Sequence, residues 1–470
     1  MSVNKLDIST IKKIPALLGE IDVIRSIQLL PGVTTVGEGA SGFNVRGGAI
    51  DQNLVLLDEA PVFNSSHLFG FFSVFNPDVI KDVKLYKGGI PAKYGGRLSS
   101  VLDIYQKEGN SRNFKATGGI GLISSRLLIE GPLEKDKSAF LIGGRSSYAH
   151  LFLPVTDNDN TAYLYNVNSK INYRFNKNNN LFLSTYFGKD VFGINDSFVN
   201  TYGNNVVNLR WNHLFSDKLF TNTTAYISNY NYFSTQKKEV DSQDESLIAN
   251  SLQETEYRST INDLAIKQDY HYFLNPNHTI RFGASAIFHT FKPGVNTLFQ
   301  KTGEQTLQGA SLDNTVKAEE FALYAEDNLS IGKKIKINVG VHASAFAVED
   351  TTYASVQPRL SARFLVNKNW SIKGGYAQMA QYLHLLTSSS LSKSSDLWVP
   401  VTKKITPPNS TQYSLGTAFN LGQYSIEIEG YYKDMNQLID YKEGAEFSVS
   451  GENWEEKVES GKGKSYGAEI

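Results

Sequence analysis

Four short motifs in this 470-residue chain have the spacing of known binding or catalytic motifs. Gly37–Gly42 has the GxGxxG spacing of a dinucleotide-binding loop, but that fingerprint needs a helix next, and an extended segment ending at Gly47-Gly48 follows instead. The SxxK motif at Ser390–Lys393 and the KTG motif at Lys301–Gly303 stand in reversed order, without the SDN motif of penicillin-recognising serine enzymes. Asp157–Asn160 begins like a calcium loop but lacks the following Gly and the distal Glu. We therefore expect no enzyme active site and no cofactor.

The composition argues against nucleic-acid binding and against metal binding. Lys and Arg total 46 and Asp and Glu total 47, so the chain has no basic excess with which to hold a nucleic acid. It has no cysteine, which excludes disulfides and thiolate metal sites and suits an oxidising compartment. The eight histidines are scattered without ligand spacing, so we predict no metal site.

No apolar stretch approaches the roughly 20 residues of a membrane-spanning helix, whereas a membrane-spanning β-strand needs only about 9–11 residues. The 25 tyrosines and 27 phenylalanines are typical of the aromatic girdles of outer-membrane barrels, although composition alone leaves a soluble all-β repeat protein open. Met1 is not followed by a signal peptide, and the chain stops in a strand pattern at Ile470. We therefore expect the sequence to be a fragment that lacks both ends.

The first 110 residues are predicted to form a small α+β domain. Ile21, Ile24 and Ile27 have helical spacing, and Pro31-Gly32 should end that helix. Asn76-Pro77 is a helix-start signal that predicts a short helix over Asp78–Lys81. The predicted strands of this domain are Asn53–Leu57, Val83–Tyr86 and Leu98–Tyr105.

From about Phe114 the pattern changes to long strands of period 2. Tyr163–Phe175 has aromatic and aliphatic residues on one face and Asn, Lys and Arg on the other, and Ile335–Ala347 and Tyr424–Tyr432 repeat the pattern. Short polar turns alternate with long polar loops, an asymmetry typical of outer-membrane barrels. The short turns are Glu134–Lys137, Asn176–Asn180, Ser216–Lys218, Asn275–His278, Gly332–Lys334, Asn367–Asn369 and Gly422–Gln423, and the long loops include Ser234–Asn250, Pro293–Asn314, Thr387–Pro408 and Lys442–Lys462.

The predicted fold is therefore mainly β. It consists of a small α+β plug domain over residues 1–110 inside a large antiparallel transmembrane β-barrel over residues 111–470. We count about sixteen strands, whereas a complete barrel of the plugged class has about 22.

The sequence resembles the TonB-dependent outer-membrane receptors, in particular the branch with a carboxypeptidase-regulatory-like domain before the plug. The matching motifs cover nearly the whole chain and include LLPGV at 29–33, GFNVRGG at 42–48, KLYKGGIPAKYGGRLSSVLDI at 84–104, QPRLSARF at 357–364 and GYYKDMNQLIDYKEGA at 430–445. The resemblance implies a Gram-negative outer-membrane location and contact with outer-membrane lipid. It further implies energy from the TonB complex through a segment before Met1, and it leaves open a lipoprotein that covers the barrel.

The resemblance also implies an ionic lock, because plug arginines of this family pair with barrel glutamates. Glu469 stands at one family glutamate position, whereas Ser414 occupies the other. Two neighbouring glutamates with lumen-facing parity are the candidate substitutes. Ordinary hydration of a polar lumen by charged residues is the alternative. The candidate lock residues are Arg46, Arg97, Glu427, Glu429 and Glu469.

Substrate contacts in this family come from the plug apex and the long loops. Aromatic rings with one His and one Asn could stack on a ligand and hydrogen-bond to it, but the phenylalanines could equally pack the plug. The candidates are Phe63, Asn64, His67, Phe69 and Phe71.

The predicted function is the import of a scarce or bulky substrate into the periplasm by energy-driven plug displacement. The substrate classes implied by the resemblance are siderophores and other metal chelates, corrinoids, oligosaccharides and peptides. The alternatives are a receptor that senses ligand and signals without import, and a passive porin or adhesin.

Overall fold

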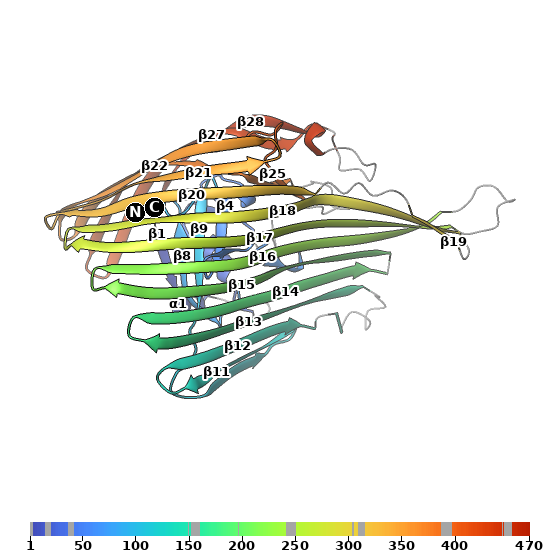
Figure 1. Cartoon of the computed structure of the whole chain (residues 1–470), viewed down its shortest axis with the longest axis horizontal. Coiled ribbons are helices and arrows are strands. Elements are labelled where there is room, and N and C mark those ends of the chain that lie inside the picture. Colours follow the sequence, from blue (N-terminus) through green and yellow to red (C-terminus); the bar gives the residue numbers. More distant parts are fainter. Residues whose placement is uncertain are drawn as a thin grey trace.

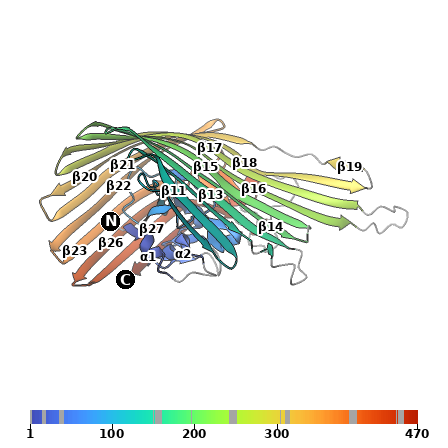
Figure 2. The ribbon, with the colours of Figure 1, turned by 90° about the horizontal axis from the view of Figure 1, so that it is seen from below.

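The computed structural model describes the chain except for residues 1–2, 15–19, 36–41, 149, 152–159, 196, 241–250, 303–304, 309–314, 387–396, 444 and 446–453. A wall of long antiparallel strands curves around a small N-terminal domain (Figures 1 and 2). No helix in the described part of the chain is long and apolar enough to cross a bilayer.

The N-terminal domain is built on a five-stranded sheet in the order β1-β8-β9-β4-β5, in which β4 and β9 are parallel and the other pairs antiparallel. Two short ribbons, β2–β3 and β6–β7, flank it. Its apolar core joins α2 to the sheet, with Ile24, Val83 and Ile104 fully buried. The elements are β1 (Val3–Asp7), α1 (Ile8–Ile11), α2 (Val23–Gln28), β2 (Val33–Thr35), β3 (Phe43–Val45), η1 (Ile50–Gln52), β4 (Asn53–Leu57), β5 (Ala60–Pro61), β6 (Ser66–His67), η2 (Leu68–Gly70), β7 (Phe72–Ser73), β8 (Ile80–Tyr86) and β9 (Ser100–Gln106).

The helix predicted before Pro31 is confirmed as α2. Its N-cap is Asp22, whose carboxylate accepts a hydrogen bond from the backbone N–H of Arg25 at 2.9 Å. The helix predicted over Asp78–Lys81 is wrong. Asn76 Oδ1 does accept from the Asp78 backbone at 3.0 Å, but only one turn forms, because Ile80 already pairs with Gln106 in the sheet.

The wall is one antiparallel sheet of seventeen strands in the described residues. One of them, β19, is a four-residue strand paired to the end of β18, so sixteen strands form the wall, as predicted. The wall strands are β10 (Lys115–Ile120), β11 (Ser124–Glu134), β12 (Ser138–Ser147), β13 (Thr161–Asn176), β14 (Asn179–Ile194), β15 (Phe198–Ser216), β16 (Leu219–Val240), β17 (Ser251–Asn275), β18 (His278–Thr302), β20 (Val316–Ile331), β21 (Ile335–Val348), β22 (Thr351–Asn367), β23 (Trp370–Ala380), β26 (Asn409–Leu421), β27 (Tyr424–Tyr441) and β28 (Val458–Glu469); β19 spans Gln305–Gln308.

Strand β13 shows that the wall is apolar outside and polar inside. Val167 and Ile171 are each 41% exposed on the outer face, whereas Asn168 and Lys170 on the inner face are 1% and 2% exposed. The inner face is buried against the N-terminal domain. Because a soluble sandwich buries its apolar face and exposes its polar one, this arrangement fits a wall in contact with lipid.

The seven predicted short turns each join two neighbouring wall strands, all at one end of the wall. The prediction of a loop from Pro293 was wrong in part, because β18 continues to Thr302 and stays paired with β17 as far as Ser251. These two strands have 25 residues each, about 80 Å at the usual rise, and project well beyond a bilayer.

Candidate functional site: the interface between the N-terminal domain and the wall

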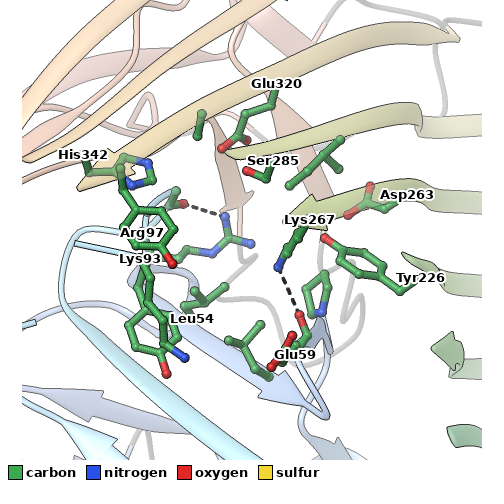
Figure 3. A pocket seen from close by; sticks show the side chains of 18 of the residues that line it. Leu54, Glu59, Lys93, Arg97, Tyr226, Asp263, Lys267, Ser285, Glu320 and His342 are labelled. Atoms are coloured by element: carbon green, nitrogen blue, oxygen red, sulfur yellow. Dashed lines mark hydrogen bonds between the residues drawn. The ribbon is translucent and has the colours of Figure 1, made fainter. Parts of the chain in front are cut away.

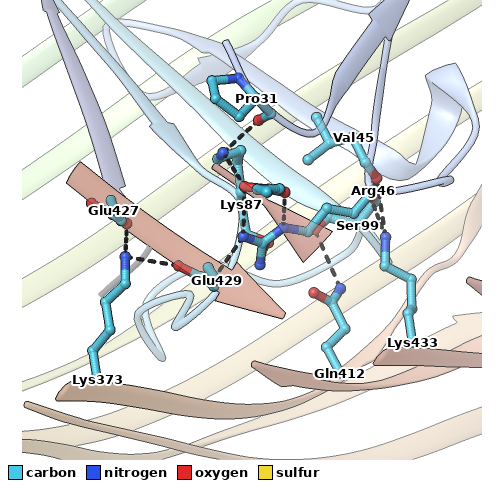
Figure 4. A network of polar contacts seen from close by, with 11 residues as sticks. Pro31, Val45, Arg46, Lys87, Ser99, Lys373, Gln412, Glu427, Glu429 and Lys433 are labelled. Atoms are coloured by element: carbon cyan, nitrogen blue, oxygen red, sulfur yellow. Dashed lines mark hydrogen bonds and ion pairs between the residues drawn. The ribbon is translucent and has the colours of Figure 1, made fainter. Parts of the chain in front are cut away.

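A buried ion cluster around Arg46 joins the N-terminal domain to the last two wall strands (Figure 4). Arg46 follows β3 in a left-handed conformation (φ 48°), and its backbone N–H donates to Gly32 O at 2.8 Å. Its Nε lies 2.7 Å from Glu469 Oε1 on β28, and its Nη2 lies 2.7 Å from Glu429 Oε1 on β27. The three side chains are 2%, 9% and 3% exposed. The sequence-predicted residues Arg46, Glu429 and Glu469 thus meet in one cluster.

Two lysines extend this cluster. Lys87 Nζ lies 2.7 Å from Glu469 Oε2 and also donates to the Pro31 carbonyl oxygen at 2.5 Å. Lys373 on β23 lies 2.7 Å from Glu429 Oε2 and also contacts Glu427. Glu427 is 55% exposed and reaches the cluster only through this lysine. The geometry therefore separates the two candidate substitutes: Glu429 binds the arginine directly and Glu427 does not.

Burial and the two carboxylates act in opposite directions on the cations of the N-terminal domain. Burial lowers the pKa of Arg46, but the hydrogen bond and charge of Glu469 and the charge of Glu429 raise it above its usual value overall. The pKa of Lys87 is lowered overall, chiefly by burial and also by the charge of Arg46, although Glu469 acts to raise it. Arg46 is therefore the permanently charged member of the cluster, since a guanidinium stays protonated at any physiological pH.

Arg97, the second predicted lock arginine, is not in this cluster. Its side chain lines a different part of the interface, and among the described residues no carboxylate oxygen lies within 4 Å of its guanidinium. Its Nη1 donates to the Gly96 carbonyl oxygen at 2.8 Å, and its charge lies 5.5 Å from the ring centre of Trp398. In this structure Arg97 therefore pairs with none of the three predicted glutamates, Glu427, Glu429 and Glu469.

The predicted substrate residues lie toward the long-loop end of the wall. Phe63 is 8% exposed and meets Trp398 edge-on, with ring centres 5.5 Å apart. The Asn64 carbonyl oxygen accepts a hydrogen bond from Asn204 Nδ2 at 2.7 Å. Phe71 is 51% exposed, and the side chain of Phe69 lies outside what the structure describes. Of the aromatic candidates whose side chains the structure describes, Phe71 alone presents an open ring.

The His67 side chain contacts wall residues at the interface. Its Nδ1 lies 2.5 Å from Asp190 Oδ2, and the ring faces Asn166 and Tyr186 on its other side. The side chain is 1% exposed and so has no surface to offer a ligand in this conformation.

An inward-folded hairpin of a long loop was not predicted from the sequence. Strands β24 (Leu383–Leu386) and β25 (Leu397–Pro400) pair with each other and not with the wall. The Asp51 carboxylate of η1 accepts hydrogen bonds from Gln381 Nε2 at 2.9 Å and from the Leu385 backbone at 3.3 Å. Burial raises the pKa of Asp51. The apolar run LWVPV at 397–401, inside the predicted polar loop Thr387–Pro408, was the signal that could have revealed it.

Two acidic residues of the β4–β5 turn make further contacts that the sequence did not reveal. Asp58 and Glu59 both have positive φ, at 47° and 76°. Asp58 Oδ1 lies 3.0 Å from Lys170 Nζ on β13, and Glu59 accepts from Thr224 Oγ1 at 2.8 Å on β16. The N-terminal domain is thus tied to several separate parts of the wall.

No group of three or more metal-ligating side chains occurs in the described part of the chain. Most of the GxGxxG, SxxK and calcium-like motifs falls in residues 36–41, 387–396 and 152–159, outside the described residues.

A polar-lined wall with an apolar exterior, closed from within by a domain held through ion pairs, defines a plugged transmembrane β-barrel of the outer membrane. Family models agree with that class: "TonB-dependent Receptor Plug Domain" matches residues 5–100, and "TonB dependent receptor-like, beta-barrel" matches residues 143–470. The chain belongs to the TonB-dependent receptor family. The family consists of non-enzymatic transporters of the Gram-negative outer membrane, and membership implies interaction with TonB.

Solved structures show the same fold at low sequence identity. The siderophore receptor PirA from Acinetobacter baumannii has a TM-score of 0.68 at 14% identity, over 94% of this chain and 71% of that one. PirA from Pseudomonas aeruginosa has a TM-score of 0.67 at 14% identity, over 96% and 77%. The ferric enterobactin receptor PfeA from Pseudomonas aeruginosa has a TM-score of 0.65 at 14% identity, over 94% and 73%. No curated protein sequence matched significantly.

Proposed function

We propose that this protein binds a scarce or bulky substrate at the outer end of its plug and imports it into the periplasm when TonB displaces the plug. The observation that carries the proposal is the Arg46 cluster. The cluster holds the plug against two wall strands through buried ion pairs, at 2.7 Å each, and without a covalent cross-link. Glu429 lies close to the short-turn end of β27, which is the periplasmic end in outer-membrane barrels.

The substrate site is proposed at the opposite end of the plug. The candidate residues all lie in one plug segment: Phe63, Asn64, His67, Phe69 and Phe71. Two wall residues that contact this segment, Asp190 and Asn204, lie toward the long-loop ends of β14 and β15. Ligands that reach the outer surface meet this end first. The solved structures with the same fold are named as siderophore and ferric enterobactin receptors, which favours a metal chelate among the substrate classes.

Uptake and binding are measured together to test this function. Cells expressing the protein are given radiolabelled ferric siderophores, corrinoids, oligosaccharides and peptides, with and without an active TonB complex. Import predicts surface binding in both strains and accumulation of the same compound only in the strain with active TonB. Accumulation that is independent of TonB overturns the proposal and supports a passive porin. Binding that never leads to accumulation supports the sensing receptor.

A further inference from the structure

A cavity of about 110 Å³ whose lining includes several charged side chains lies between the plug and wall strands β16 to β21, away from the Arg46 cluster (Figure 3). Plug residues Lys93 and Arg97 line it from one side, and Lys267 and Ser285 line it from the wall. Its volume accommodates several water molecules or one small ion with water. In Figure 3 the guanidinium of Arg97 and the ammonium of Lys267 both point into this space.

Three basic side chains at this cavity meet carboxylates only through their charge, at longer range than an ion pair. Among the described residues, no carboxylate oxygen lies within 4 Å of the charged nitrogens of Lys93, Arg97 or Lys267. Each instead lies near an aromatic ring: Lys93 is 4.4 Å from the Tyr94 ring centre, Arg97 5.5 Å from Trp398 and Lys267 4.9 Å from Tyr226. A ring face attracts a cation but accepts few of its hydrogen bonds, so N–H donors of these basic groups remain available to an acceptor.

Arg97 is the clearest case of a buried cation whose hydrogen-bond donors are not all satisfied. The residue is 6% exposed, it donates to one backbone oxygen, and its Nε is buried without a hydrogen-bond partner. A buried guanidinium is costly unless its donors are satisfied. In the part of the chain that the structure describes, Lys267 likewise donates only to the backbone oxygen of Glu59, at 3.1 Å.

The carboxylates that line the same cavity are already engaged by other groups. Asp263 lies 2.7 Å from His289 Nδ1, and Glu320 lies 3.6 Å from the other nitrogen of the same ring. Asp269 accepts a hydrogen bond from Tyr324, and Glu59 accepts from Thr224 and lies 3.8 Å from Arg210. The acidic groups thus have close donors, whereas Arg97 and Lys267 each donate to one backbone oxygen and feel the carboxylates only through their charge.

From this arrangement we infer that the cavity binds a free small oxyanion of the phosphate or sulfate class, held between Arg97 of the plug and Lys267 of the wall. The anion oxygens accept from the free N–H groups of both residues and from the Ser285 hydroxyl, and Lys93 adds positive charge at the cavity edge. Charge-assisted hydrogen bonds of this kind are short and strong, and a planar guanidinium suits two oxygens of one anion. The cavity is too small for a bulky solute while the plug is in place, which argues for a free ion.

Such an anion would be a second ionic link between plug and wall. The Arg46 cluster uses two wall carboxylates, whereas at Arg97 an anion from solution takes the part of the missing carboxylate. This inference concerns binding alone and does not depend on transport.

Equilibrium dialysis of the detergent-solubilised protein against radiolabelled inorganic phosphate, at constant ionic strength, tests the inference. We expect one phosphate per chain, with affinity at least tenfold weaker in Arg97→Gln and in Lys267→Gln. Arg112→Gln is the matched control, because Arg112 is an exposed arginine paired with Asp136 at 2.6 Å, and it should bind as the wild type does. Heat-modifiable migration in gels establishes that each variant is folded. Lys267→Gln alters the wall only, so it tests the cavity even if Arg97→Gln does not fold.

Diffraction from crystals grown with selenate then locates the ion. An anomalous peak within hydrogen-bonding distance of Arg97 and Lys267 supports the inference. Water alone in the cavity, or phosphate binding that survives both substitutions, overturns it.

Discussion

Arg46 and Glu469 are 423 residues apart in the sequence, yet Arg46 Nε lies 2.7 Å from Glu469 Oε1. The pairing requires the register of strand β28 against β27, in which Glu469 stands opposite Glu429. One guanidinium then spans two carboxylates from neighbouring strands. The plug is thereby fixed to the wall at a point that the two strands define jointly.

Replacing Arg46 by Gln leaves two carboxylates buried near one another without their shared cation. The usual cost of leaving one partner of a buried ion pair uncompensated is about 3–5 kcal/mol. Because Lys87 and Lys373 still pair with Glu469 and Glu429, we expect the plug to lose stability up to that amount. Urea titration of plug unfolding, followed by planar-bilayer conductance, measures this loss as channel opening at lower urea concentration.

Glu427→Gln is the control for this experiment, because Glu427 lies on the same strand as Glu429 but is 55% exposed. A partly exposed pair contributes at most about 1 kcal/mol, so this variant should open close to the wild-type urea concentration. Equal effects of the two substitutions would show that the cluster does not hold the plug.

The period-2 pattern was enough to predict the wall, its inner and outer faces and its short turns. It also gave Glu427 and Glu429 the same inward parity, but it could not separate them. Their difference comes from how far the plug extends along the lumen, which depends on packing between domains and has no local signal. The same holds for Arg97, whose neighbours are set by the position of strands β16 to β21 around the plug. The inward hairpin β24–β25 was missed because its strands pair with each other over a plug surface that only the folded domain provides.

His67 and Phe71 are expected to respond differently to substitution by alanine. His67→Ala leaves the Asp190 carboxylate buried without its 2.5 Å partner and should lower thermal stability, with a cost of about 1–3 kcal/mol. Phe71→Ala removes a ring that is 51% exposed, so stability should change little while substrate binding to cells weakens. Thermal melts and whole-cell binding assays measure the two effects. Unchanged binding of every recognised substrate by Phe71→Ala would remove Phe71 from the proposed site.

Strand β13 provides a test of the lipid-facing surface. Val167 is 41% exposed near the middle of the strand, so Val167→Arg should cost about 2–4 kcal/mol of folding free energy in a bilayer. Phe175 is 56% exposed but lies beside a short turn, so Phe175→Arg should cost only about 0–1 kcal/mol. Urea unfolding of the protein in lipid vesicles compares the two variants. A similar loss of folding free energy in both variants would show that the outer face of β13 is not in contact with lipid.

Asp51, which contacts the hairpin, makes the folding stability of the protein depend on pH. Its pKa in the folded protein is raised above 3.8, chiefly by burial, so the folded state binds its proton more tightly than the unfolded state does. Stability contributed by this proton is present below pH 3.8 and is lost as pH rises through the folded-state pKa. We therefore expect the free energy of unfolding of the wild type, relative to that of Asp51→Asn, to rise as pH falls toward 3.8. Asp51→Asn keeps an acceptor for the Leu385 amide, which donates to Asp51 at 3.3 Å, but it cannot titrate. Urea titration of both proteins over this pH range measures the difference, and a difference that is constant with pH would show that the pKa of Asp51 does not change on folding.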